Sequence, residues 1–471
     1  MQNSDKFLNH LESILATRAS KSQLRKLTTL DSSPAHPLAD FSSNDYLSLA
    51  SDPVLHATFL AELASAKSTT LISPTRTTGS GGSRLLDGNS RYAEALEHDL
   101  ARVHGAPAAL LFGSGYDANV AVYTCIPQPG DVVVYDEYIH ASVHDGMRAS
   151  RAAKLYPFAH NCVKDVHVKR GKNKTRQLES LEQVLKKVDE LHGPSTRVFV
   201  AIESVYSMDG DVAPLADIVS IIFERHNRSS YTMGPTYLIV DEAHATGVLG
   251  APKGPALGLV NAESLESACL VRVHTFGKAV GAAGAVVLCP RVLREYLVNY
   301  ARPFIYSTAP PLAALAAVRA SYALLGASLQ CAGITNLSAT AVLAATRHDT
   351  LWARTTHLHT RLRALFPEPG PSPPSVPRIE YAAVGSDIPA SSIFAVRCAG
   401  PADTRARALA AYCQARGFIV RAIVYPTVPR GMERVRVCVH EGNSVEEIEG
   451  LLACMCAWQE LQSAREISAK L

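Results

Sequence analysis

Two stretches of this chain, Tyr237-Leu-Ile-Val-Asp-Glu-Ala-His244 and Thr275-Phe-Gly-Lys-Ala-Val-Gly281, decide how it is expected to fold. In the first stretch, a short apolar run leads directly into Asp241, as at the end of a buried strand. In the second stretch, Lys278 lies in a glycine-flanked turn between apolar segments. Both stretches therefore indicate strands that deliver a charged side chain at the strand end.

Lys278 and Asp241 are the two kinds of side chain that pyridoxal 5′-phosphate (PLP) requires. PLP needs a lysine for a Schiff base and a carboxylate to keep its pyridine nitrogen protonated, so we expect PLP as the cofactor.

Two other interpretations of nearby motifs are weaker. Gly113-x-Gly115-x-x-Ala118 imitates a dinucleotide-binding fingerprint, but a dehydrogenase has no use for the lysine–aspartate pair. Asp241-Glu-Ala-His244 is spelled like a helicase motif, but the chain has no Gly-Lys-Ser/Thr phosphate loop.

Short apolar runs alternate with helical patterns along the first two thirds of the chain. The expected strands are 108–112, 132–135, 198–202, 237–240 and 285–288. This alternation predicts an α/β fold with a largely parallel sheet. Polar residues follow most of these strands, and open parallel sheets bind ligands at the carboxyl ends of their strands. We therefore expect these polar residues to share one site.

The domain organisation follows from changes in this pattern. We expect an N-terminal helical segment over 1–50, with an amphipathic helix at 6–26, and a large cofactor-binding domain over 51–310. Residues 311–471 are expected to form a smaller C-terminal α+β domain with strands near 392–397, 418–424 and 435–439. Residues 164–196 are expected to be a basic, polar insertion around a helical segment at 178–191.

Composition narrows the function class. The chain has 471 residues, 47% of them hydrophobic and 19% charged, as in an ordinary globular enzyme. A net charge of +3 indicates no nucleic-acid or membrane-surface role, and no apolar run is long enough for a membrane span. The ten cysteines show no metal-ligand spacing, so we expect no metal site and we expect the thiols to be reduced.

The two ends of the chain differ in what they indicate about targeting. We expect no signal peptide, because the acidic residues Asp5 and Glu12 interrupt the N-terminal segment. The terminal Ala469-Lys470-Leu471 resembles a peroxisomal address.

Several motifs in order along the chain resemble the α-oxoamine synthases of PLP fold type I. They are Phe41-Ser-Ser-Asn-Asp-Tyr-Leu47, Gly79-Ser-Gly-Gly-Ser83, Leu111-Phe-Gly-Ser-Gly-Tyr116, His140-Ala-Ser142, Ser207-Met-Asp-Gly-Asp211, Val240-Asp-Glu-Ala-His244, Thr275-Phe-Gly-Lys278, Ile305-Tyr-Ser-Thr308 and Pro426-Thr-Val-Pro429. The resemblance implies a large PLP-binding domain with a smaller C-terminal domain. It also implies a homodimer with shared active sites.

The resemblance assigns cofactor roles to particular residues. It implies that Lys278 holds PLP and later moves the Cα proton, that Asp241 pairs with the pyridinium nitrogen, and that His140 stacks on the ring. The further cofactor contacts that it implies are Gly115, Tyr116, Ser207, His244, Thr275 and, from a neighbouring subunit, Thr308.

The resemblance also implies how substrates bind. Arg436 would bind the amino-acid carboxylate in a bidentate contact. Alternation on a strand puts Arg434 on the same face as Arg436, so the choice between them rests on the resemblance. Asn44 would also contact substrate, and Arg25 and Thr427 match positions that contact the acyl substrate.

Within the family, the chain most resembles the branch that serves biotin synthesis. This implies a decarboxylating condensation of L-alanine with pimeloyl-CoA. One departure is Val424, which stands where that branch often has an arginine. Another acyl-CoA or amino acid therefore remains an alternative, as do a fold type I aminotransferase or aldolase and a non-catalytic partner subunit.

Overall fold

The computed structural model describes residues 2–21, 23–25, 27, 29, 38–68, 77–164, 178–227, 236–250, 256–334, 336–369, 378–381, 388–398 and 402–468. The chain divides into two compact units, residues 1–38 and 39–471. The first unit contains helix α1 (Gln2–Ser20), where the sequence predicts a helix at 6–26. The apolar side chains of α1, including Phe7 and Leu15, are exposed.

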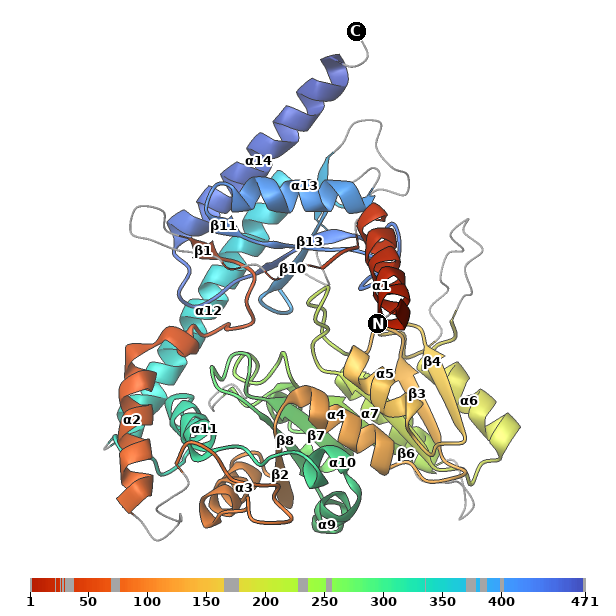
Figure 1. Ribbon diagram of the computed structural model, residues 1–471, viewed down its shortest axis with the longest axis vertical. Coiled ribbons are helices and arrows are strands. Elements are labelled where there is room, and N and C mark those ends of the chain that lie inside the picture. Colours follow the sequence, from red (N-terminus) through yellow and green to blue (C-terminus); the bar gives the residue numbers. More distant parts are fainter. Residues whose placement is uncertain are drawn as a thin grey trace. The chain divides into compact units, whose positions relative to one another are not determined.

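A seven-stranded sheet forms the centre of the second unit (Figure 1). Its strands, in sheet order, are β2 (Ala108–Phe112), β8 (Ala285–Cys289), β7 (Cys269–Thr275), β6 (Thr236–Asp241), β5 (Val198–Glu203), β3 (Val132–Asp136) and β4 (Lys154–Phe158). Every neighbouring pair is parallel except the two pairs that involve β8. The expected α/β fold with a mainly parallel sheet is confirmed, although β4 and β7 were not among the expected strands.

Helices cover both faces of this sheet, and the side chains of each strand alternate between two apolar clusters. On one face lie α4 (Gly115–Cys125), α5 (Ala141–Arg148), α9 (Arg291–Tyr300) and α10 (Arg302–Ile305). On the other lie α3 (Arg91–Val103), α6 (Leu181–His192), α7 (Leu215–Asn227) and α11 (Leu312–Leu324). Each fully buried aliphatic side chain contributes about 1.5–3 kcal/mol through the hydrophobic effect. The sheet is therefore a rigid platform for the residues at its edge.

The helical segment predicted at 178–191 is confirmed as α6, but the interpretation of its stretch as an exposed insertion is wrong for the described second half. Residues 178–196 contain α6, whose Leu181, Val184 and Val188 are buried against the sheet. A capping box, formed by Ser180 and Gln183, begins this helix. Residues 165–177 lie outside the described part of the chain.

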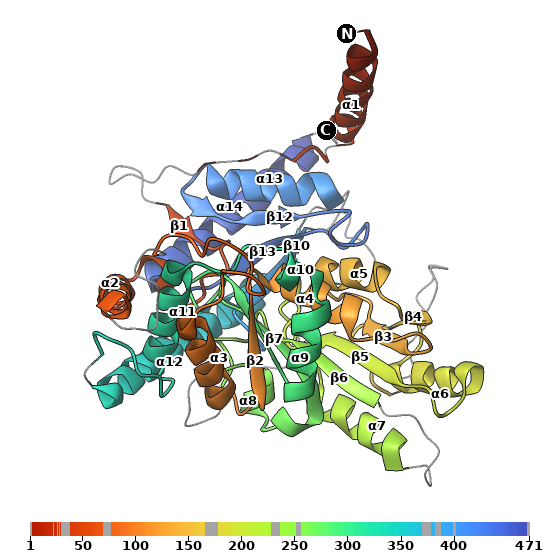
Figure 2. The same ribbon diagram turned by 60° about the horizontal axis from the view of Figure 1, so that its bottom comes forward.

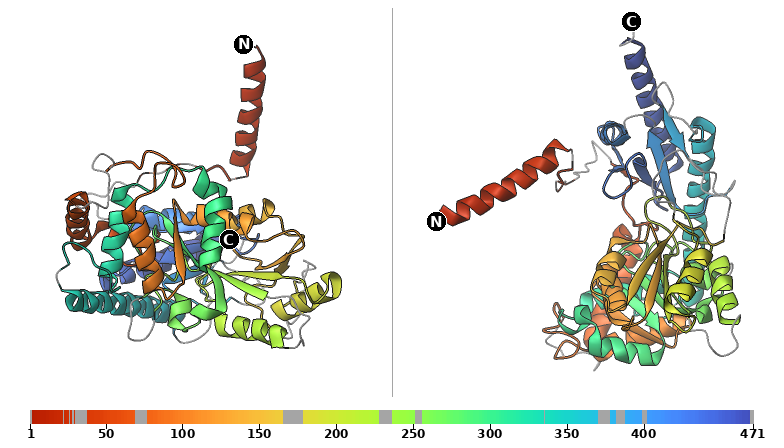
Figure 3. Two further views of the ribbon diagram at one scale, coloured as in Figure 1. Left: turned by 90° about the horizontal axis from the view of Figure 1, so that it is seen from below. Right: turned by 90° about the vertical axis from the view of Figure 1, so that its right-hand side faces the viewer.

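A second, antiparallel sheet follows in the C-terminal part of the chain (Figures 2 and 3). Its strands, in sheet order, are β12 (Arg421–Ile423), β13 (Arg434–Cys438), β10 (Ile393–Cys398) and β9 (Ile379–Tyr381). The helices of this part are α12 (Leu337–Leu365), α13 (Ala402–Gln414) and α14 (Val445–Ser468). Strands near 392–397, 418–424 and 435–439 were expected, and β10, β12 and β13 lie there; β9 was not expected.

The N-terminal side of the second unit is tied to this smaller sheet region. The short strand β1 (Ala39–Asp40) pairs in parallel with β11 (Phe418–Ile419). Phe41 then accepts a backbone hydrogen bond from Cys438 of β13. Residues 42–47 follow at once, so this pairing carries Asn44 and Tyr46 to strand β13. The remaining helices are the 3₁₀ turn Leu49–Ser51, α2 (Pro53–Ser68), α8 (Leu259–Ala262) and the 3₁₀ turn Glu266–Ala268.

Candidate active site

Polar side chains gather at the carboxyl edge of the central sheet, as the sequence predicts. Asp136, Glu203, Asp241 and Thr275 are the last residues of β3, β5, β6 and β7. Glu203 and Asp241 are direct neighbours across β5 and β6. A parallel sheet with its carboxyl ends aligned in this way is the usual place for a ligand.

Asp241 is buried and held by two N–H donors. Asn119 Nδ2 lies 2.7 Å from Asp241 Oδ2, and the backbone N–H of Ala243 lies 2.9 Å from Oδ1. The same Asn119 amide is 3.0 Å from Ser142 Oγ. These bonds fix the orientation of the carboxylate, which is what a partner for a pyridinium nitrogen needs.

The turn between β2 and α4 has the chemistry of a phosphate site. Ser114 caps α4 by accepting a hydrogen bond from the backbone N–H of Asp117, and helix N-termini attract anions. A Cβ added at Gly115 would lie 3.2 Å from Thr275 Cβ, so glycine allows the turn to approach the end of β7 closely. Tyr116 is 46% exposed, and its hydroxyl donates to Asp145. Gly115 and Thr275 therefore lie close together, and the phosphate contacts expected of them stay predictions.

Lys278 lies in a tight turn after β7. Its carbonyl accepts from Gly281 N–H at 2.8 Å, and the flanking Phe276 pairs with Gly284. Lys278 is half-buried, and its amine lies among charged groups. Burial lowers the pKa of Lys278 to about 8; Arg436 adds to this effect, while Asp241 and Glu203 oppose it. An amine with this pKa is suited to proton transfer near neutral pH.

Two histidines flank this lysine and stay neutral. His140 precedes α5, and its Nδ1 lies 2.8 Å from Ser142 Oγ. Burial lowers the pKa of His140, although the charge of Asp241 opposes this shift. Burial also holds the pKa of His244 well below its usual range, with Lys278 and Arg436 adding to the effect. His244 Nδ1 is hydrogen-bonded to the Tyr46 hydroxyl at 2.7 Å, which leaves Nε2 for a ligand.

Arg436 joins this group from strand β13 of the smaller sheet. Its Nη2 donates to Asn44 Oδ1 at 2.9 Å and to the Tyr46 hydroxyl at 3.3 Å. Arg436 is 8% exposed, and its Nε has no acceptor among the described residues. A buried guanidinium with donor capacity to spare is suited to bind a carboxylate.

The other predicted site residues lie in several places. Ser207 is half-buried in the turn after β5. Thr308 is exposed, and the adjacent Ala309 bonds through its backbone to Gly82 and Ser80 of the glycine-rich loop. Thr427 is exposed in the β12–β13 loop, where its N–H donates to Val424. Arg25 belongs to the unit 1–38, which is described by itself. The roles of these residues stay predictions.

Three residues with central positions were given no role from the sequence. Tyr46 links His244 to Arg436, Asn119 holds Asp241, and Glu203 lies beside Asp241. Glu203 accepts a hydrogen bond from the backbone N–H of His140. The available signals were weak: Glu203 ends an apolar run, and Asn119 lies one helical turn after Gly115.

These residues fit PLP. An amine of lowered pKa, a fixed carboxylate, a neutral imidazole and a glycine-lined helix N-terminus are the parts that this cofactor requires. In the part of the chain that the structure describes, no cluster of histidine, cysteine and acidic side chains could hold a metal ion. None of the described helices is long and apolar enough to cross a bilayer.

Comparison with known proteins identifies the class. The model of the aminotransferase class I and II family matches residues 36–453, and the chain belongs to this family. Within it, the chain is a PLP-dependent acyltransferase of the α-oxoamine synthase type. The predicted family, cofactor and fold type I are thus confirmed.

Particular relatives and structures support this placement. The chain is 43% identical over 458 residues to the 8-amino-7-oxononanoate synthase of Emericella nidulans, covering 97% of each protein. It is 35% identical over 463 residues to the aminoacyl transferase sphA of Aspergillus fumigatus, covering 97% of this chain and 88% of that one. The serine palmitoyltransferase of Sphingomonas wittichii has the same fold, with a TM-score of 0.72, 23% identity and 98% coverage of both chains. The structure of the 8-amino-7-oxononanoate synthase of Francisella tularensis gives a TM-score of 0.62 and 24% identity, and the match covers 90% of this chain and 98% of that synthase chain.

Proposed function

We propose that this enzyme joins L-alanine to pimeloyl-CoA with loss of CO2, releasing CoA and 8-amino-7-oxononanoate. The observation that carries the proposal is the 43% identity to an 8-amino-7-oxononanoate synthase over 97% of both proteins. Such a match includes the motifs around Lys278, Asp241 and Arg436 and covers nearly the whole length of the relative.

The side chains of the site can be given roles in this reaction. PLP, when bound, supplies an electron sink for the carbanion that forms at Cα. Arg436, with Asn44 beside it, binds the amino-acid carboxylate and orients the Cα bonds. Asp241 would hold the cofactor nitrogen, and His140 would cover the ring face. Gly115 and Thr275 would hold the phosphate.

Lys278 is the group that moves protons at Cα. With a pKa of about 8, roughly a tenth of its free amine is unprotonated at pH 7, so it can both accept and return a proton. Neutral His140 and His244 do not add positive charge around this amine. Burial and the charge of Arg436 are what favour the basic form of this amine.

A different acyl chain is the second candidate. Val424 stands where an arginine often lies in the biotin branch, and Val424 has no charge to bind a terminal carboxylate. The 35% identity to an aminoacyl transferase, over 97% of this chain, also favours a related condensation with other substrates.

Mass spectrometry of the products tests both candidates. Purified, PLP-loaded protein is mixed with L-alanine, glycine or L-serine and a panel of acyl-CoAs that includes pimeloyl-CoA. Formation of 8-amino-7-oxononanoate with free CoA supports the proposal. Reaction of another pair supports the second candidate. A product without CoA release would favour an aminotransferase or aldolase, and an intact cofactor without any turnover would favour a non-catalytic subunit.

Two wider properties belong to the proposal. We propose a homodimer in which Thr308 contributes to the active site of the partner subunit. Sedimentation tests the dimer. Mixing Lys278→Ala subunits with Thr308→Ala subunits tests the shared site, because a mixed dimer has one intact site and should regain activity.

We also propose import into peroxisomes. The support is Ala469-Lys470-Leu471, which lies outside the described residues. A fluorescent protein fused to the N-terminus should co-localise with a peroxisomal marker, and this co-localisation should disappear when the three C-terminal residues are removed.

A further inference from the structure

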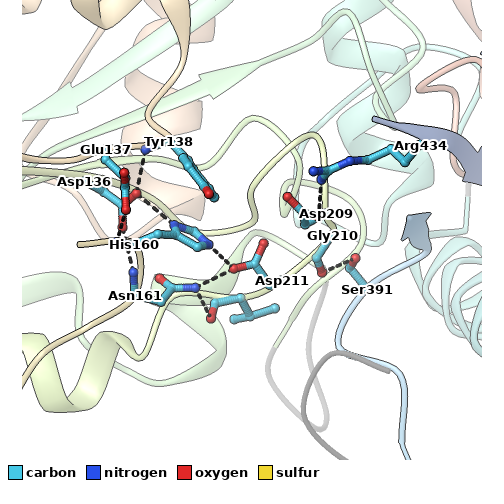
Figure 4. Close-up of polar contacts among 11 residues, drawn as sticks. Asp136, Glu137, Tyr138, His160, Asn161, Asp209, Gly210, Asp211, Ser391 and Arg434 are labelled. Atoms are coloured by element: carbon cyan, nitrogen blue, oxygen red, sulfur yellow. Dashed lines mark hydrogen bonds and ion pairs between the residues drawn. The ribbon is translucent and has the colours of Figure 1, made fainter. Parts of the chain in front are cut away.

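A histidine that the reaction does not use lies between two aspartates (Figure 4). His160 comes two residues after the end of β4, and 17% of its side chain is exposed. Its Nδ1 lies 2.8 Å from Asp136 Oδ1, at the end of β3, and its Nε2 contacts Asp211 Oδ2. The imidazole therefore joins the edge of the central sheet to the segment that carries Ser207.

The partners require His160 to be an imidazolium. An ionised carboxylate only accepts hydrogen bonds, so a ring bonded to two carboxylates must carry a proton on both nitrogens. Asp136 also accepts from the backbone N–H of Tyr138 through Oδ1 and of Asn161 through Oδ2, each at 2.9 Å, so both of its oxygens act as acceptors. Burial would lower the pKa of His160, but the hydrogen bonds and charges of Asp136 and Asp211 outweigh it and raise this pKa to about 10.

Every element around the ring favours the same charge state. Tyr138 stacks on the imidazole at 4.4 Å between ring centroids, and Tyr206 meets its edge at 4.5 Å. The Glu137 carboxylate accepts from the backbone N–H of His160 at 3.0 Å. The titratable groups that face His160 are thus two aspartates, one glutamate and two tyrosines, and none of them adds positive charge.

Asp211 belongs to a closed turn. Val205 and Val212 pair as an isolated β-bridge, Tyr206 N–H donates to Asp211 O at 2.9 Å, and Gly210 N–H donates to Tyr206 O at 2.9 Å. We call residues 205–212 the clamp turn. Ser207 lies within it. Because the Asp211 side chain is held by His160 and by Asn161 Nδ2 at 2.6 Å, the position of the whole turn depends on these contacts.

The far side of the clamp turn contacts the smaller sheet. Arg434 Nη1 of β13 donates to Asp209, and Ser391 Oγ donates to Gly210 O at 2.6 Å (Figure 4). The Arg434 side chain is 1% exposed, and its Nε donates a hydrogen bond to the backbone oxygen of Met432 at 2.7 Å. Two residues further along β13 lies Arg436. The clamp turn therefore connects the carboxylate-binding strand to the edge of the central sheet.

We propose that His160 is a positioning residue: its imidazolium, held by Asp136 and Asp211, fixes the clamp turn, which through Asp209 and Arg434 sets the place of Arg436 relative to Asp241 and Lys278. The inference rests on the PLP-dependent acyltransferase class and does not depend on which amino acid or acyl-CoA reacts. It assigns to the Ser207-Met-Asp-Gly-Asp211 motif a mechanical task beyond the contact of Ser207.

The charge of His160 is tested on the full-length wild-type protein. With ¹⁵N-labelled histidine, NMR should show one ring with protons on both nitrogens at about pH 8, where an ordinary histidine is neutral. The signal is assigned by its loss in His160→Gln. If this ring is neutral at that pH, the proposal is overturned whatever the substrates prove to be.

Positioning is tested with His160→Gln against His98→Gln, a matched change at an exposed histidine of α3. L-alanine, glycine and L-serine are titrated into the PLP-loaded proteins without acyl-CoA, and binding is followed by the cofactor absorbance. We expect His160→Gln to weaken amino-acid binding roughly tenfold or more, with a smaller change in kcat, and His98→Gln to have no effect. Unchanged binding in His160→Gln would overturn the proposal.

A second variant guards against a failure to fold. Asp209→Asn removes the charge that Arg434 contacts at a side chain that is 20% exposed. It should weaken amino-acid binding in the same way while leaving the His160 NMR signal in place. If Asp209→Asn folds and binds the amino acid as the wild type does, the clamp turn does not position Arg436.

Discussion

Glu203 and Asp241 end adjacent parallel strands in register, so two acidic side chains project from the same face of the sheet beside Lys278. Glu203 is 3% exposed, and its Oε1 has no hydrogen-bond partner among the described residues. Burial, and then the charge of Asp241, raises the pKa of Glu203 well above 4.5. Of the two acids, Glu203 is therefore the one whose neutral form is favoured.

Replacing Glu203 by Gln should make the protein relatively more stable as pH rises. The folded state keeps Glu203 neutral, while the unfolded chain loses this proton above pH 4.5, so ionisation favours unfolding of the wild type. Gln has no proton to lose. The gap in Tm between Glu203→Gln and wild type should widen from about pH 4.5 upward, whereas Glu190→Gln, at an exposed site on α6, should show no such trend. A constant gap would contradict a neutral Glu203.

Lys278 should be identified by its reactivity in the cofactor-free protein. Because its pKa is about 8, its amine is unprotonated more often than that of an ordinary lysine near pH 7.5, and a small acylating reagent should modify it first. Peptide mass spectrometry measures the ratio to the exposed Lys186, whose side chain is 56% exposed. PLP should protect Lys278, and Lys278→Ala should lose the yellow colour of the loaded enzyme and all turnover. Equal modification of both lysines would contradict the lowered pKa.

The parts of this fold that could be predicted from sequence are those fixed by local pattern. Apolar runs such as 108–112 predict strands that the structure contains, and Asp241 comes directly after an apolar run, as the last residue of β6. β4 was missed because its edge position leaves Lys154 exposed and interrupts the apolar pattern. His160 was missed because its role depends on Asp136 and Asp211, which lie 24 and 51 residues away along the chain and meet only in three dimensions.

Arg436→Lys should weaken recognition of the amino acid. The guanidinium of Arg436 holds Asn44 and Tyr46 and still has Nε to offer, whereas an ammonium group cannot make the same planar, bidentate contact. We expect KM for the amino acid to rise by about 10–100-fold, with a smaller change in KM for the acyl-CoA. Steady-state kinetics with each substrate varied in turn measures this, with Arg91→Lys on the exposed start of α3 as the control. Equal changes in both KM values would argue against a carboxylate contact.

Gly210→Ala should destabilise the protein more than an alanine at a glycine with similar backbone strain. Gly210 has φ +77°, and an added Cβ would lie 2.2 Å from Ile393 O, so the clamp turn would have to move away from β10. Gly130 has φ +93° but nothing within 4 Å of the added atom, so Gly130→Ala reports the backbone strain alone. We expect about 1 kcal/mol for Gly130→Ala and about 2–4 kcal/mol for Gly210→Ala in equilibrium denaturation. Because the clamp turn connects to Arg436, Gly210→Ala should also weaken amino-acid binding. Equal losses of stability in the two variants would show that the clamp turn does not pack against β10 in this way.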